Sequence, residues 1–261
     1  FGAILSFQTQ LPFDALPVWK EFRAQSLDEQ RRALADPTMR QRLIHSADTA
    51  EYGRAIGTEA RKPEWQYVFP VTAGLPPYET IAELAAARGT SPMETFIDIA
   101  VESDLNMFFM QAAANHDQDR VLEFLRHPQA IPTFSDSGAH VSQIMDSSLQ
   151  THMLGHWVRN EQAFTIEQAV HRMTQVPATA WGFLDRGVIA PGMAADINVF
   201  DLGTVTPDMP ELVYDLPGGA RRLRQTASGF RATLVNGQVL LDHGEATGAR
   251  PGQLLRGRLA N

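Results

Sequence analysis

Residues 130–140 read AIPTFSDSGAH: a short apolar run, a carboxylate at Asp136, a turn of small residues and a histidine at His140. The apolar run predicts a short strand over 130–134. If that strand belongs to a β/α barrel, its carboxyl end faces the active site. A carboxylate at that place is positioned to bind a metal or to take a proton from a metal-bound water. Asp-Ser-Gly is also favourable turn chemistry, so a purely structural turn is the alternative.

The chain before this stretch alternates between helical and strand signals. An Ala-rich helix is predicted over 79–88, and a second helix begins at a Ser91 cap and runs to about residue 103. A buried strand is expected at 105–110 and a short helix at 120–126. This rhythm is typical of a β/α barrel or of an open α/β sheet.

The character changes after residue 186, where the signals are those of strands. Residues 196–200 alternate as a strand does, and Asn236-Gly237 predicts a hairpin within 232–241. One hairpin and one or two strands do not form a stable two-faced sheet alone. Residues 1–60 contain no predicted strand that would complete it. We therefore expect part of the protein to be missing from this chain.

The composition is that of an ordinary globular protein. The 261 residues are 44% hydrophobic and 20% charged, with a net charge of −8. The negative charge argues against nucleic-acid binding, which needs a positive face. No apolar stretch approaches the ~20 residues of a membrane span, so we expect no membrane partner and a cytoplasmic location. The sequence has no cysteine, so any metal must be held by His, Asp or Glu.

Three further clusters carry polar side chains. Asn115-His116-Asp117 follows the predicted strand at 105–110 and would lie on the same barrel rim as Asp136; a capped turn is the alternative. His152 and His156 share a helix face and are spaced to chelate zinc, but two partly buried histidines near a helix end are favoured. The basic run at 221–224 is spaced to bind a carboxylate, although a loop anchored to Asp215 is favoured.

Several segments together resemble a known family. They are SDSGAHVSQIMDSS (135–148), RGVIAPGMAADINVFD (186–201), YDLPGGARRL (214–223) and ATLVNGQVLLDHGEATGARPG (232–252). The chain resembles the C-terminal half of the D-aminoacylase (N-acyl-D-amino-acid deacylase) branch of the amidohydrolase superfamily. The resemblance covers nearly the whole chain.

This resemblance implies an α/β fold: the C-terminal part of a metal-dependent (β/α)8 barrel over 1–185, followed by strands of a small β-sandwich over 186–261. It implies a zinc cofactor, with most of the ligands in an N-terminal half outside this chain. Asp136 then corresponds to the residue that acts as general base, later as general acid, and contacts the metal. We assign Asn115 and His140 to substrate binding.

The expected function is therefore zinc-dependent hydrolysis of a C–N amide bond in a small-molecule substrate, with this chain alone incomplete as an enzyme. The alternative is a catalytically incomplete fragment or degenerate homologue without metal. The sequence leaves open the substrate, which is an N-acyl-D-amino acid, another amide, a dipeptide or a cyclic imide-like compound. It also leaves open the number of metal ions and whether the protein is a homo-oligomer.

Overall fold

A computed structural model of the chain describes residues 2–53, 61–133, 135, 137–138, 140–144 and 147–255. Five helices form the first part of the described chain: α1 (Pro17–Arg23), α2 (Leu27–Leu34), α3 (Pro37–Thr49), α4 (Ile81–Arg88) and α5 (Pro92–Glu102). Their ends follow local capping chemistry. The Ser26 hydroxyl accepts from the Glu29 N–H while the Glu29 carboxylate accepts from the Ser26 N–H, as the sequence predicts for a capping box. Gly89 ends α4 in the left-handed conformation, with φ 69°.

Aromatic side chains form the core among these helices. Trp19 of α1 is fully buried, and its indole Nε1 donates to the Leu43 carbonyl of α3 at 3.0 Å. Phe96 of α5 is also fully buried, and its ring centroid lies 4.2 Å from that of Phe109 in the neighbouring sheet. Each such side chain contributes about 1.5–3 kcal/mol by its removal from water. The core therefore fixes the sheet to the helices.

That sheet has three strands, β1 (Gly2–Leu5), β2 (Val68–Pro70) and β3 (Phe109–Ala112), in the order β1-β3-β2. Both pairings are antiparallel, whereas the strands of a β/α barrel pair in parallel. The expected barrel pairing is therefore not formed by these three strands. An antiparallel ladder is slightly more stable per residue, which matters for strands this short, and a barrel requires its full set of strands to close.

Two strand predictions are corrected in detail. Residues 104 and 105 both have positive φ (60° and 63°), and the Leu105 N–H donates to the Ala100 carbonyl at 2.7 Å. This segment therefore closes α5, and the strand predicted from 105 begins only at Phe109. The strand predicted over 130–134 is absent at 131–133, where Pro132 has no N–H for a ladder. Phe134 lies outside the described residues.

The middle of the chain is helical. It contains α6 (Gln118–Arg126), α7 (Leu149–His152), a π-helix η3 (Met153–Asn160), α8 (Ile166–Met173) and α9 (Gln175–Ala180). The helix predicted at 147–159 is confirmed, but its second half is a π-helix, in which the Glu161 N–H donates to the His156 carbonyl five residues back at 2.9 Å. Among the described residues, none of the helices has the length and apolar character that crossing a membrane requires.

The last part of the described chain consists of short strands and turns. One sheet has the order β11 (Glu245–Ala246), β10 (Gln238–Asp242), β9 (Phe230–Val235), β4 (Ile197–Phe200); two ribbons pair β5 (Thr206–Pro207) with β8 (Ala227–Ser228), and β6 (Glu211–Leu216) with β7 (Ala220–Arg224). The predicted hairpin is confirmed, with positive φ at both Asn236 and Gly237. No residue of the four-stranded sheet is buried.

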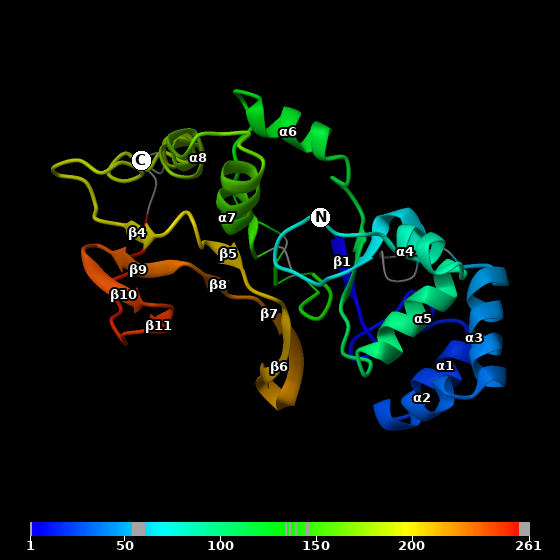
Figure 1. Cartoon of the computed structure of the whole chain (residues 1–261). Helices are drawn as coiled ribbons and strands as arrows, with labels where there is room; N and C mark the ends of the chain where they lie inside the picture. Colours follow the sequence, from blue (N-terminus) through cyan, green and yellow to red (C-terminus); the bar gives the residue numbers. More distant parts are fainter. Residues whose placement is uncertain are drawn as a thin grey trace.

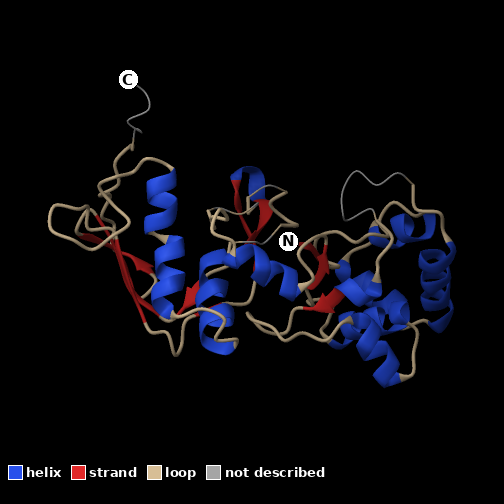
Figure 2. Ribbon diagram, turned by 90° about the horizontal axis from the view of Figure 1, so that it is seen from above, coloured by secondary structure: helices blue, strands red, loops and turns tan. Residues whose placement is uncertain are grey.

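The helices α1–α5 gather at one end of the molecule and the four-stranded sheet lies at the other (Figure 1). Seen from above, the chain is elongated between these two ends, with α7 and the ribbon strands between them (Figure 2).

Candidate active site

The SDSGAH segment continues into a loop that two distant strands hold by backbone hydrogen bonds. Asp136 itself lies outside the described residues, and so does Ala139. On one side of the loop, the Ile4 N–H of β1 donates to the Gln143 carbonyl at 2.6 Å. On the other side, the Leu223 N–H of β7 donates to the Val141 carbonyl at 2.7 Å. The loop at 140–144 therefore lies between β1 and β7.

His140 turns the chain at the start of this loop. Its φ is 49°, and its carbonyl accepts from the Gln143 N–H at 2.7 Å and from the Ile144 N–H at 3.3 Å. Its side chain is exposed. Gly138, two residues earlier, has φ 93°, a conformation that favours glycine. The small residues of the motif thus allow a tight reversal next to Asp136, and the substrate-binding role of His140 stays a prediction.

Asn115 lies in a capped turn after β3. It has φ 59°, is exposed, and its carbonyl accepts from the Gln118 amide nitrogen at 3.2 Å. Asp117 caps α6 by accepting from the Arg120 N–H at 3.1 Å. Within the described residues, no hydrogen bond joins Asn115 to the loop at 140–144. The structure therefore supports the capped-turn alternative for the local geometry, and the shared rim with Asp136 stays a prediction.

A cleft of about 420 Å³ begins at Thr133, three residues before Asp136. Gln150 of α7 lines it and donates to the Thr133 carbonyl at 3.2 Å. Trp181 and Arg186 also line it, and Arg186 pairs with the carboxylates of Asp185 and Asp196. Sequence reasoning did not place these side chains in a site, because only the fold brings residues 173–196 next to Thr133. The sequence motif around Arg186 indicates the family but does not show where the Arg186 side chain lies in the fold.

The described residues do not provide a zinc site. No group of three or more His, Asp or Glu side chains among them is arranged to hold a metal ion. The His152 and His156 rings are 4.8 Å apart, and among the described residues only the exposed Glu161 carboxylate approaches, 4.0 Å from His156 Nδ1. Catalytic zinc needs three protein ligands and an open position. The favoured interpretation of these histidines, as partly buried groups near a helix end, therefore agrees with the structure.

Burial disfavours the charged form of both imidazoles. Burial, with a smaller effect of the neighbouring His156, lowers the pKa of His152 to about 4. Burial also lowers the pKa of His156, which Glu161 partly opposes. The Nδ1 atom of His156 is buried without a hydrogen-bond partner in the described part of the chain.

Two arginines of the basic run at 221–224, Arg222 and Arg224, form ion pairs within the β6–β7 ribbon, as the favoured interpretation predicts. Arg222 forms two hydrogen bonds of 2.7 Å with Asp215, and this contact lowers the pKa of the Asp215 carboxyl. Arg224 donates to Glu211 at 2.7 Å across the same ribbon. Arg221 instead leaves the ribbon and donates to the carbonyls of Gln8 and Thr9, at 2.7 and 3.1 Å.

Comparison with known proteins places the chain in a family. The sequence profile described as "Amidohydrolase family" matches residues 4–241. The chain belongs to the amidohydrolase family. It is 28% identical over 198 residues to N-acyl-D-aspartate deacylase of Alcaligenes xylosoxydans xylosoxydans, a match that covers 73% of this chain and 34% of that protein. It is 37% identical over 106 residues to N-acyl-D-glutamate deacylase of the same organism, covering 41% of this amidohydrolase chain and 20% of that protein.

Solved structures give a weaker likeness. A crystal structure of D-aminoacylase is 26% identical, with a TM-score of 0.42, and the match covers 66% of this chain and 33% of that one. N-acyl-D-glutamate deacylase from Bordetella bronchiseptica, complexed with zinc and a phosphonate inhibitor, is 27% identical with a TM-score of 0.40, covering 73% and 38%. The chain thus spans about a third of the length of the first relative named above. The resemblance to D-aminoacylases stated from the motifs is confirmed by sequence.

Proposed function

We propose that this amidohydrolase chain belongs to an enzyme that hydrolyses a C–N amide bond of a small molecule, an N-acyl-D-amino acid or a related amide. The observation that carries the proposal is the family match over residues 4–241, together with the sequence similarity to two N-acyl-D-amino-acid deacylases. This similarity favours a hydrolase over a degenerate homologue.

Asp136 is proposed as the group that moves the proton. A water oxygen adds to the amide carbonyl carbon while Asp136 accepts the water proton. The C–N bond then breaks, and Asp136 returns the proton to the leaving nitrogen. The products are a carboxylic acid and an amine, and the acid then gives its proton to the amine or to water. The loop after Asp136, which β1 and β7 hold from both sides, supports this role because a proton-transfer group must be fixed close to its partner.

The remaining assignments follow the family resemblance. Asn115 and His140 are proposed to contact substrate, and zinc is proposed as the cofactor, with Asp136 as one ligand. Among the described residues, no set of side chains is arranged to hold this ion. We also propose that residues 1–185 belong to a β/α barrel and residues 186–261 to a β-sandwich in the whole, cytoplasmic protein.

Replacement of Asp136 tests the central claim. In the full-length enzyme, Asp136→Asn should lower kcat on N-acyl-D-amino acids by about 10²–10⁴, because general acid–base catalysis contributes that much. The thermal midpoint should be unchanged. Asp36→Asn is the control, since the Asp36 side chain caps α3 by accepting from the Thr38 N–H at 2.9 Å, and it should keep its activity. Near-normal turnover of Asp136→Asn would refute the assignment, and absence of amide hydrolysis by the wild-type protein would favour the degenerate homologue.

A further inference from the structure

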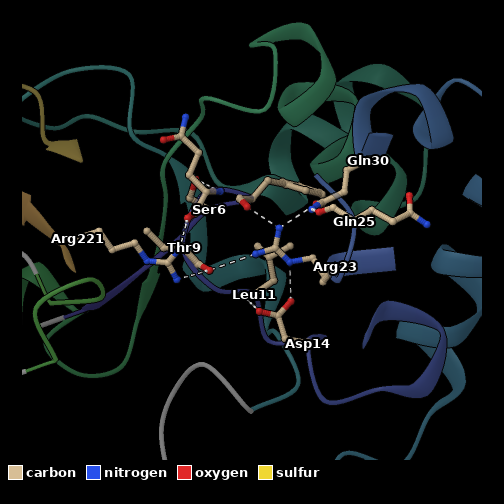
Figure 3. Close-up of polar contacts among 10 residues, drawn as sticks. Ser6, Thr9, Leu11, Asp14, Arg23, Gln25, Gln30 and Arg221 are labelled. Atoms are coloured by element: carbon tan, nitrogen blue, oxygen red, sulfur yellow. Dashed lines mark hydrogen bonds and ion pairs between the residues drawn. The ribbon is translucent and has the colours of Figure 1, made fainter. Parts of the chain in front are cut away.

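A second cleft, of about 510 Å³, lies where the segment after β1 meets α1, α2 and the β6–β7 ribbon. Three cationic side chains line it, Lys20, Arg23 and Arg221, against one carboxylate, Asp14. The whole chain carries a net charge of −8, so the positive charge of this cleft is opposite in sign to the net charge of the protein. Figure 3 shows Arg23 and Arg221 approaching Thr9 from opposite sides.

Arg23 is part of the framework. Its side chain is only 11% exposed, and its Nε–H donates to Asp14 at 2.9 Å. Its other donors reach the carbonyls of Phe7 and Thr9 and the side-chain oxygen of Gln30. This network fixes the backbone at Thr9. The Asp14 carboxylate neutralises the charge of the Arg23 guanidinium group.

Arg221 has no such neutralising partner. Its two hydrogen bonds go to backbone carbonyls, and no carboxylate pairs with it within the described residues. These two bonds leave its Nε–H and one N–H on each terminal nitrogen without a protein acceptor in that part of the chain. Arg23 and Arg221 each place a terminal nitrogen 3.1 Å from the same oxygen, that of Thr9. Two cations held this close repel each other, and an anion between or beside them relieves that repulsion.

Thr9 provides an independent indication. It is 4% exposed and lines the cleft, and its hydroxyl Oγ1 is buried with no hydrogen-bond partner in the described residues. A buried hydroxyl without a partner is costly, so native structures rarely keep one without a reason. An acceptor oxygen that reached this hydroxyl from the cleft would satisfy it.

We propose that this cleft binds the carboxylate or phosphate group of a small anion. Arg221 supplies N–H donors in the fork geometry that suits both groups, the Thr9 hydroxyl donates to one anion oxygen, and Lys20 adds charge at the cleft wall. Arg23 and Asp14 position the Thr9 segment. The residues that line this cleft do not include the loop at 140–144, and the proposal does not depend on the proposed hydrolysis.

Calorimetric titration of the 261-residue chain with inorganic phosphate and with acetate, at constant ionic strength, tests the proposal. We expect saturable binding of at least one probe, and the two titrations show which anion class is preferred. Arg221→Gln should weaken it about tenfold or more, since a hydrogen bond to a charged group is lost. Thr9→Val keeps the shape of the side chain and should weaken binding about fivefold without lowering the thermal midpoint. Arg224→Gln, on the same strand but paired with Glu211, is the matched control and should bind as the wild type does.

The absence of saturable heat with both probes would overturn the proposal. Binding that neither Thr9→Val nor Arg221→Gln weakens would place the anion elsewhere and would equally refute it. Thr9→Val decides the question if Arg221→Gln does not fold, because the valine removes only a hydroxyl that makes no hydrogen bond among the described residues.

Discussion

The buried side chain of His152 makes the free energy of unfolding depend on pH. Its pKa in the folded protein is about 4 because it is desolvated beside His156, whereas an unfolded chain gives it the ordinary value near 6.5. The unfolded chain therefore takes up a proton first as the pH falls. The stability that neutral His152 provides is complete above about pH 6.5 and is lost progressively down to about pH 4.

We expect His152→Gln to flatten this dependence. The wild-type free energy of unfolding should fall by up to about 3 kcal/mol between pH 7 and pH 4 through this group alone. The variant should lose that part of the slope in urea titrations at a series of pH values. His243→Gln is the control, because the His243 side chain is 76% exposed. An unchanged slope in His152→Gln would contradict the burial argument.

Close approach of elements around β5 depends on glycines. A Cβ atom at Gly74 would lie 1.8 Å from the Pro207 carbonyl oxygen, and one at Gly229 would lie 2.5 Å from the Val205 Cα. Val205 itself is fully buried. The turn at Gly74 therefore contacts the backbone of β5 directly. Gly229, just before β9, contacts the backbone of Val205, the residue before β5.

Gly74→Ala should lower the free energy of unfolding by about 3 kcal/mol, because backbone and not a flexible side chain occupies the space. Chemical denaturation with an unchanged m-value measures this effect. A Cβ atom at Gly53 meets no described residue within 4 Å, so Gly53→Ala should change stability by less than about 0.5 kcal/mol. Equal stability of Gly74→Ala and the wild type would show that this contact can relax.

The helices could be predicted from sequence and the sheets could not, for a physical reason. A capping box such as Ser26 with Glu29 or a terminator such as Gly89 acts within one turn, so its signal is local. The antiparallel partner of β1 lies more than a hundred residues away in the sequence, and no local sequence pattern identifies it. The hairpin at Asn236-Gly237 is the exception because its two strands are adjacent in sequence.

The candidate site divides in the same way. The residue types around Asp136 indicate its chemistry, and the family resemblance built on them is confirmed. The hydrogen bonds that Ile4 and Leu223 make to the loop, and the cleft that joins Thr133 to Arg186, arise from tertiary contacts. Sequence spacing carries no information on such contacts until the fold is known.

At the scale of the molecule, Arg159 connects the central helices to the C-terminal strands. It lies in η3, and its Nη1 donates to the carbonyls of Leu202, Gly203 and Val205, the last at 2.6 Å. These three carbonyls precede β5, so one guanidinium group fixes the connection between the two parts of the chain.

Arg159→Gln should release this connection. We expect limited proteolysis to cut within 201–209 several-fold faster than in the wild type, because local opening exposes the backbone there. Arg120→Gln removes an exposed ion pair with Glu123 and is the control for loss of charge. Identical cleavage rates for Arg159→Gln and the wild type would mean that the connection is held by other contacts.

The contacts that fix the loop after Asp136 also affect how the protein matures on the ribosome. Ile4 is translated before its partner Gln143, whereas Val141 is translated some eighty codons before its partner Leu223. The loop therefore cannot take its final shape until Leu223 has left the exit tunnel. A nonsense codon before position 223 would release a polypeptide whose helices can form but whose Asp136 segment lacks half of its support.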